Sequence, residues 1–137
     1  MTVPFELKGL DHIVLRVRDI DRMIGFYTDI LGCRMERILP EVGLYQLRAG
    51  NSLIDLVPLD GKLGAAGGAG PGAEGRNLEH FCLEISPFDE AEIKAHLARH
   101  GVEAGPVGQR YGAGGEGPSL YLRDPEGNNV ELKARLP

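Results

Sequence analysis

One motif occurs twice in the chain and constrains its fold more than any other feature. An acidic residue, a histidine and an alternation of apolar and polar residues make up Asp11–Val17, and the pattern returns at Glu79–Ile85. Such alternation, rich in β-branched residues, predicts a strand in each case, with His12 and His80 at equivalent positions. An internal repeat of this length indicates a duplicated supersecondary unit. We therefore expect two similar halves that pack against each other.

A helix should follow each of these strands. In the first half, Asp19 is a good N-cap, apolar residues recur at helical spacing, and Gly32 is a plausible stop. In the second half, Ser86 followed by Pro87 predicts the helix start, and Gly101 its end. The remaining apolar runs predict strands at 33–39, 44–48, 53–57, 119–123 and 129–133. Each half therefore reads as strand, helix and about three strands.

The length favours a single α+β domain covering residues 1–137. Module 1 spans about residues 8–58, and module 2 spans about residues 77–135. Between them, residues 59–76 are rich in glycine and show no periodicity. Such a segment buries too little side chain to pack by itself, so we interpret it as a mobile connector.

Charge and hydropathy exclude several classes of partner. The formal net charge is −5, and no run of Lys or Arg would attract nucleic acid or anionic lipid. No apolar stretch is long enough to span a membrane, and the N-terminus lacks a signal-peptide pattern. We expect a cytoplasmic protein that binds a small molecule, without nucleic acid or membrane partners.

Two histidines and two carboxylates stand at equivalent places in the halves. His12 and His80 lie on the first strands, and Glu131 and Asp55 lie on the last strands. Two imidazoles and a carboxylate suit Mn, Fe, Ni or Zn and leave positions open for substrate. We predict a divalent metal held by His12, His80 and Glu131, with Asp55 as a possible fourth ligand and both carboxylates as candidate catalytic groups. In the alternative interpretation, these are ordinary polar residues on solvated sheet faces.

Further residues are candidates for contact with a substrate. Arg16 shares a strand face with the first histidine, and it either binds an anionic substrate group or pairs with Glu84, its counterpart in the repeat. Arg110 and Tyr111 belong to a glycine-rich segment that is either a lid over the site or a solvated hairpin loop. Tyr121 lies on the strand before Glu131, and we list it as a candidate catalytic residue.

Three segments together resemble the vicinal oxygen chelate superfamily, which contains glyoxalase I, fosfomycin- and bleomycin-resistance proteins and extradiol dioxygenases. They are Asp11–Leu15, Glu79–Phe81 and Tyr121–Leu132, which includes an Asp-Pro-Glu-Gly-Asn turn. The resemblance implies two paired βαβββ modules whose curved mixed sheets enclose a metal cavity. It places the metal ligands on the two histidines and Glu131. Asp55 stands where glyoxalase I has a glutamate, so glyoxalase I activity itself does not follow.

The resemblance also implies a homodimer, with modules paired within a chain or across the interface so that sites are shared. The expected activity is that of a metal-dependent lyase, isomerase or transferase of the glyoxalase or fosfomycin-resistance type. Its metal would act as a Lewis acid on a small oxygenated or electrophilic substrate. Two alternatives remain open: an Fe(II) extradiol-type dioxygenase, and a non-catalytic binding protein like those of bleomycin resistance.

Overall fold

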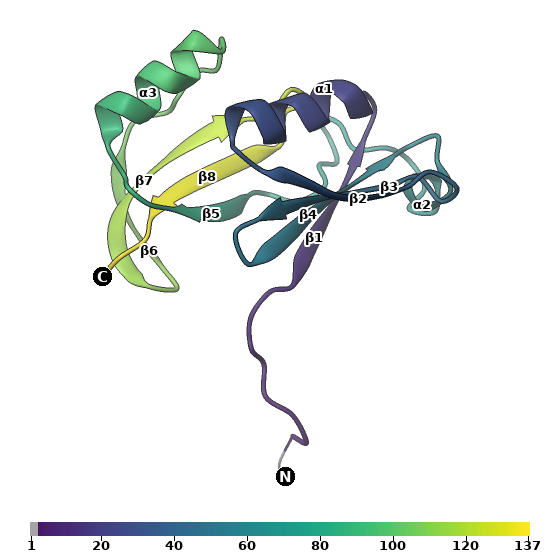
Figure 1. Ribbon diagram of the computed structural model, residues 1–137, viewed down its shortest axis with the longest axis horizontal. Coiled ribbons are helices and arrows are strands. Elements are labelled where there is room, and N and C mark those ends of the chain that lie inside the picture. Colours follow the sequence, from purple (N-terminus) through teal and green to yellow (C-terminus); the bar gives the residue numbers. More distant parts are fainter. Residues whose placement is uncertain (1–2) are drawn as a thin grey trace.

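Two four-stranded sheets of identical topology form the molecule, as the computed structural model of residues 3–137 shows (Figure 1). Module 1 contains β1 (His12–Val17), α1 (Ile20–Gly25), a π-helical turn η1 (Phe26–Ile30), β2 (Arg34–Leu39), β3 (Leu44–Ala49) and β4 (Ser52–Pro58). Module 2 contains β5 (Phe81–Ile85), α3 (Glu90–Arg99), β6 (Gly108–Gly112), β7 (Gly115–Arg123) and β8 (Asn129–Ala134), and α2 (Lys62–Ala65) lies between the modules. The predicted α+β fold of two βαβββ modules is confirmed.

The first and last strands of each module lie side by side. The strand orders are β1-β4-β3-β2 and β5-β8-β7-β6, with the first pair parallel and the others antiparallel. Strands of equal rank in the two modules therefore occupy equal positions in their sheets. This order brings β1 next to β4, and β5 next to β8, so His12 lies on the strand beside that of Asp55, and His80 immediately precedes the strand beside that of Glu131.

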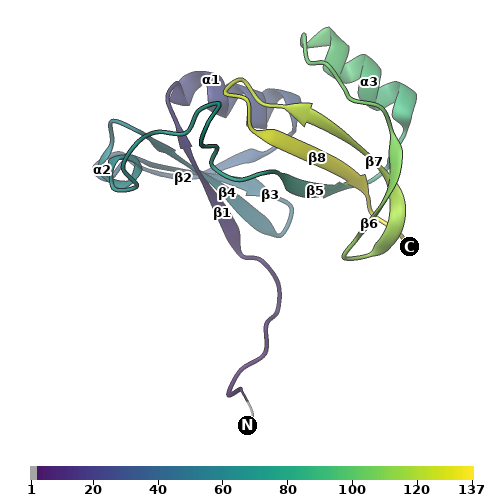
Figure 2. The same ribbon diagram turned by 180° about the vertical axis from the view of Figure 1, so that it is seen from behind.

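The apolar face of each sheet is buried and the other face is left open. On β1, Leu15 and Val17 are fully buried, whereas His12 and Val14, on the other face, are exposed. This is the alternation expected for a strand with one covered face. Figures 1 and 2 show α1 and α3 on the same side of the two sheets. The covered side is therefore the core, and the histidine lies on the opposite face.

Contacts from the turn between β7 and β8 hold α1 against module 2. The Tyr27 hydroxyl, buried in η1, donates a 2.7 Å hydrogen bond to the Asp124 carboxylate. The Glu126 carboxylate accepts hydrogen bonds of 2.8 to 2.9 Å from the backbone N–H groups of Arg18 and Asp19. These charge-assisted bonds satisfy donors near the start of α1. The Asp-Pro-Glu-Gly turn thus connects the two modules.

One local prediction is wrong. The helix of module 2 begins at Glu90, not at Ser86, because the Asp89 side chain caps it by accepting a 3.1 Å hydrogen bond from the Glu92 N–H. The connector contains the one-turn helix α2. Three of its carbonyl oxygens, in Gly64, Gly68 and Ala69, accept hydrogen bonds from the Arg16 guanidinium.

No helix within residues 3–137 combines the length and the apolar character needed to cross a bilayer.

Candidate metal centre

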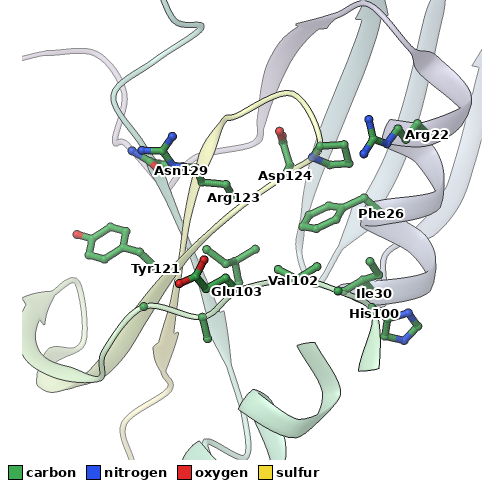
Figure 3. A pocket seen from close by; sticks show the side chains of 15 residues that line it. Arg22, Phe26, Ile30, His100, Val102, Glu103, Tyr121, Arg123, Asp124 and Asn129 are labelled. Atoms are coloured by element: carbon green, nitrogen blue, oxygen red, sulfur yellow. The ribbon is translucent and has the colours of Figure 1, made fainter. Parts of the chain in front are cut away.

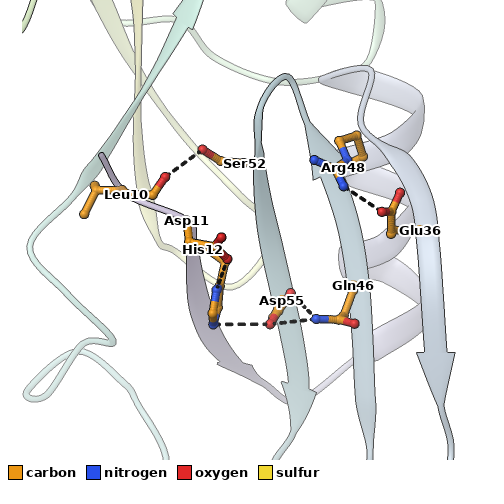
Figure 4. Close-up of polar contacts among 8 residues, drawn as sticks. All are labelled: Leu10, Asp11, His12, Glu36, Gln46, Arg48, Ser52 and Asp55. Carbon is orange, nitrogen blue, oxygen red and sulfur yellow. Dashed lines mark hydrogen bonds and ion pairs between the residues drawn. The ribbon is translucent and has the colours of Figure 1, made fainter. Parts of the chain in front are cut away.

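The first half-site combines His12 of β1 with Asp55 of β4 on the open face of sheet one (Figure 4). His12 Nε2 lies 3.9 Å from Asp55 Oδ2, and the carboxylate is only 3% exposed. Gln46 of β3 donates to both carboxylate oxygens at 3.2 and 3.3 Å. Arg37 of β2 in turn donates to the Gln46 side-chain oxygen at 2.8 Å. This network fixes the carboxylate in place beside the imidazole.

The second half-site repeats the arrangement with His80 and Glu131. His80 Nε2 lies 3.3 Å from Glu131 Oε1, and Glu131 on β8 is 6% exposed. Tyr121 of β7 stands opposite Glu131 in the strand register, and its ring meets the His80 ring edge-on at 5.4 Å. The Arg110 guanidinium covers the other side of this group, 4.8 Å from the centre of the Tyr121 ring. A cation–π contact of this kind orients both side chains.

The strand registers show that the two half-sites are equivalent. Val14 pairs with Asp55 and Cys82 pairs with Glu131, each two residues after the histidine. On the other side of each carboxylate, Gln46 is the register partner of Asp55, as Tyr121 is of Glu131. The duplication therefore extends from the histidine and carboxylate to the neighbour that supports the carboxylate.

Each histidine is oriented by the acidic residue that precedes it. The Nδ1 atoms of His12 and His80 lie 2.7 Å from carboxylate oxygens of Asp11 and Glu79. A carboxylate on one ring nitrogen holds the tautomer that leaves the other nitrogen free for a metal. The hydrogen bond from His12 to the Asp11 carboxylate, together with the charge of Asp55, raises the pKa of His12. Binding a metal ion there would therefore compete with protonation of the ring.

Tyr121 keeps its proton near neutral pH. Burial raises the pKa of its hydroxyl, and the charge and hydrogen bond of Glu131 raise it further. The hydroxyl is thus a hydrogen-bond donor directed at the Glu131 carboxylate, as suits a residue placed beside a metal-ligating group.

The donor atoms fit a divalent transition metal, but they do not assemble within one chain. Two ligand atoms bound to one ion lie about 3 to 3.4 Å apart; the 3.3 Å separation of His80 and Glu131 falls in this range, and the 3.9 Å separation of His12 and Asp55 is longer. Across residues 3–137, however, no group of three or more His, Cys, Asp or Glu side chains is placed to hold a metal ion. The structure therefore brings His12 to Asp55 and His80 to Glu131, and it leaves the two pairs apart.

The predicted substrate-binding residues have different locations. Arg16 lies on the same strand as His12, but its guanidinium donates hydrogen bonds to carbonyl oxygens of the connector. It does not pair with Glu84, whose carboxylate lies 3.6 Å from the Arg135 guanidinium. Arg110 lies on the open face beside Tyr121. Tyr111 alternates to the opposite face of β6 and is 85% exposed. The predicted lid is a regular hairpin of β6 and β7, because backbone pairing from Gly108 to Ser119 uses its polar groups.

A cleft of about 690 Å³ lies between α1 and the segment after α3 (Figure 3). Phe26 and Ile30 face Val102 across it, and Arg22 and Tyr121 lie on opposite sides of it. Its lining includes neither histidine of the half-sites and neither carboxylate. Because Tyr121 is the register partner of Glu131, the cleft borders the second half-site without containing its histidine or its carboxylate.

Comparison with known families agrees with the two-module topology. The family model described as "Glyoxalase/Bleomycin resistance protein/Dioxygenase superfamily" matches residues 9–132. The chain belongs to this superfamily. The resemblance predicted from the three sequence segments is thereby confirmed. Members of the superfamily typically bind a divalent metal, which is consistent with the donor atoms of the two half-sites.

Relatives cover nearly the whole chain. Glyoxalase domain-containing protein RDO1 of Mycosarcoma maydis is 32% identical over 140 residues, which covers 93% of this chain and 69% of RDO1. Virulence protein STM3117 of Salmonella typhimurium is 30% identical over 128 residues, or 90% of this chain and 81% of STM3117. The crystal structure of STM3117 matches with a TM-score of 0.77 at 25% identity, covering 96% of this chain and all of the other.

A further structure supports the fold alone. The lactoylglutathione lyase from Agrobacterium tumefaciens matches with a TM-score of 0.67 at 22% identity, over 94% of this chain and 95% of that one. The two-module glyoxalase fold is thus shared well beyond the range of clear sequence similarity.

Several residues of the half-sites were absent from the sequence-based prediction. Gln46 supports Asp55 from the neighbouring strand, and Asp11 and Glu79 hold the histidine rings. The acids are visible in sequence as the residue before each histidine. Gln46 could be found only from the register between β3 and β4, which the sequence does not specify.

Proposed function

We propose that this member of the glyoxalase superfamily is a metal-dependent enzyme, a lyase, isomerase or transferase that acts on a small oxygenated or electrophilic substrate. The observation that carries the proposal is the duplicated pair of an oriented histidine and a buried carboxylate. A structural histidine has no need of a second carboxylate on its free nitrogen, and a metal site does. Mn, Ni, Zn and Fe all suit this donor set.

The complete site, in this proposal, forms between two copies of the chain. One copy supplies His12 and Asp55, and the other supplies His80 and Glu131. Support comes from the separation of the pairs within residues 3–137, where no group of three ligands is found. A two-fold dimer would bring unlike modules together twice and so produce two equal sites.

The residues of the chain would then have distinct roles. His12, His80 and Glu131 hold the ion, and the ion supplies Lewis-acid stabilisation of negative charge on a substrate oxygen. Asp55, the shorter carboxylate, either completes the ligand set or accepts a proton from the substrate. Tyr121, the register partner of Glu131, places its hydroxyl-bearing ring beside that carboxylate and the His80 ring. Gln46 donates hydrogen bonds that hold Asp55 in position.

Metal content tests the proposal directly. The wild-type protein is reconstituted anaerobically with Mn, Fe, Ni or Zn, and bound metal is measured by elemental analysis. We expect about one ion per chain in the wild type and none in a His12→Ala/Glu131→Ala variant. A His100→Ala/Glu103→Ala variant, which removes the same residue types from an exposed region, should bind as the wild type does. A wild type without metal, or a double variant that keeps it, contradicts the proposal.

A further inference from the structure

Four arginines line one small cavity where the two modules meet. The cavity has a volume of about 100 Å³ and lies among the end of β1, the connector and the turn between β7 and β8. Among residues 3–137, its lining contains a single acidic side chain, that of Glu126, and no ligand of either half-site. The four arginines are Arg16, Arg18, Arg76 and Arg123. This local excess of positive charge contrasts with the formal net charge of −5 for the whole chain.

The connector holds two of these arginines in place. The guanidinium groups of Arg16 and Arg18 donate hydrogen bonds of 2.6 to 3.3 Å to four carbonyl oxygens within residues 64–71. A Cβ atom at Gly67 would lie 2.5 Å from Arg16 Nη1, and one at Gly70 would lie 3.0 Å from Arg18 Nη2. The glycines therefore let the connector pass directly over both side chains. As a result, two cations are fixed side by side under one segment that borders the cavity.

The four guanidinium groups have no carboxylate partner in the described part of the chain. The arginines of residues 3–137 that lie within 4.0 Å of a carboxylate oxygen are Arg48 and Arg135, and neither lines the cavity. The Glu126 carboxylate borders the cavity, but both of its oxygens accept hydrogen bonds from backbone N–H groups near the start of α1. It offsets at most one of four positive charges. Like charges gathered in one place repel each other, and an anion from solution relieves this repulsion.

The cavity also has hydrogen-bond donors to spare. Of the five N–H groups of a guanidinium, Arg16 uses three and Arg18 uses one on the connector. The exposed side chains of Arg76 and Arg123 donate no hydrogen bond within residues 3–137. Asn77 fixes the wall between the modules, because its side chain accepts from the Arg16 backbone N–H and donates to the β7–β8 turn, each at 3.1 Å. The cations thus border a wall of defined geometry.

We propose that this cavity binds a phosphate group, either inorganic phosphate or the phosphoryl end of a small molecule. Guanidinium N–H groups match phosphate oxygens in pairs, and a dianion neutralises two of the four cations. The volume of about 100 Å³ is below the roughly 300 to 1,000 Å³ of pockets that enclose a whole small-molecule ligand, so the cavity suits one compact anion or one end group.

The site is separate from the candidate metal centre. Arg16 follows His12 by four residues on β1, which places the cavity about 13 Å along the strand from the first half-site. The proposal therefore does not depend on the function proposed above. The bound anion would join β1 and the connector to the β7–β8 turn, and it would thereby stabilise the contact between the modules.

Calorimetric titration of metal-free protein with inorganic phosphate tests the site, at constant ionic strength so that screening does not change. Acetate is the comparison anion, because it carries one charge on a planar group. The variant Arg76→Gln/Arg123→Gln removes the two exposed cations and leaves the connector contacts in place. The matched control, Arg34→Gln/Arg99→Gln, removes two exposed arginines from β2 and α3. We expect phosphate to bind the wild type and the control at least tenfold more tightly than acetate, and to bind the variant about tenfold more weakly.

Phenyl phosphate distinguishes the two sources of the group. If it binds as tightly as inorganic phosphate, the cavity accepts the phosphoryl end of a small molecule. If inorganic phosphate alone binds, the ligand is the free ion.

Thermal unfolding separates binding from a structural role of the arginines. Phosphate should raise the Tm of the metal-free wild type and of the control, and it should raise that of Arg76→Gln/Arg123→Gln much less. Without phosphate, this variant should be at least as stable as the wild type, because it removes like charges that lie close together. Wild-type protein that binds phosphate no better than acetate overturns the inference, as does a variant that binds phosphate as tightly as the control. A variant less stable than the control without phosphate also overturns it, since the arginines would then stabilise the fold with no anion.

Discussion

At the scale of single residues, the environment of each group decides its chemistry. Cys82 shows this well, because it stands between the candidate ligands of module 2 and opposite Glu131 in the register. The residue is exposed, yet desolvation of its thiol and the charge of Glu131 raise its pKa to about 11. The positive charge of Lys133 acts in the opposite direction. The thiol is thus protonated near neutral pH and is a poor nucleophile.

Thiol reactivity can report these charges. In metal-free protein that carries Cys33→Ala, we expect Cys82 to react slowly with iodoacetamide at pH 8. Glu131→Gln should speed the reaction severalfold, because removing the negative charge lowers the pKa and increases the thiolate fraction. Lys133→Met should slow it. The rates are followed by mass spectrometry, with Glu116→Gln on the exposed hairpin as the control. Equal rates in the Glu131→Gln variant and the control would contradict the predicted influence of Glu131.

The pairing of each histidine with a carboxylate was predictable from sequence because strand alternation needs no knowledge of neighbours. His12 and His80 fall at equal places in a repeated motif, and Glu131 lies in a strand whose faces can be assigned by parity. Gln46 was not found, since its role depends on which residue lies opposite it in the sheet. Register between strands is set by the turns and the core together and not by one segment.

At the scale of elements, the Asp-Pro-Glu-Gly turn has a structural role. It carries much of the resemblance to the superfamily, yet its side chains contact α1 and not the candidate ligands. Glu126 accepts from two backbone donors near the start of α1, and Asp124 accepts from Tyr27. The turn therefore positions module 1 against module 2.

Removal of the Glu126 carboxylate tests this role. We expect Glu126→Ala to lower the free energy of unfolding by about 1 to 2 kcal/mol, because donors near the start of α1 lose a charged acceptor. Urea denaturation monitored by circular dichroism measures the change. Glu41→Ala, which removes an exposed glutamate from the β2–β3 turn, should change stability by less than about 0.5 kcal/mol. Similar losses in both variants would show that the contacts of Glu126 contribute nothing specific.

Element boundaries followed the sequence where capping was unambiguous and departed from it elsewhere. Asp19 begins α1 as predicted, with its side chain accepting from the Arg22 N–H. In module 2 the sequence predicted a helix start at Ser86, but Asp89 is the N-cap residue that determines the start of α3. The sequence left the glycine-rich segment as either a lid or a hairpin loop, because glycine content reports backbone freedom and not strand pairing, and the structure forms the hairpin.

At the scale of the whole molecule, the duplication explains why a single chain presents two incomplete sites. Each module carries one oriented histidine and one buried carboxylate, and neither pair alone supplies the three or four ligands that a transition metal needs. Within residues 3–137 the pairs stay separate. In the proposed dimer, unlike modules would together supply the missing ligands.

Mixing of defective chains distinguishes a shared site from one built within a chain. His12→Ala and His80→Ala proteins should each bind no metal. After the two are unfolded together and refolded as a 1:1 mixture, half of the dimers are mixed, and each mixed dimer has one intact site. Bound metal should then recover to about a quarter of the wild-type amount.

The matched control mixes His80→Ala with Glu131→Ala. Both changes fall in module 2, so no pairing of the chains restores an intact site, and metal should stay absent. If the sites formed within one chain, neither mixture would recover metal, since every chain keeps its own defect. Recovery confined to the first mixture would therefore assign His12 and His80 of each site to different subunits, and elemental analysis of the refolded dimers decides between the two arrangements.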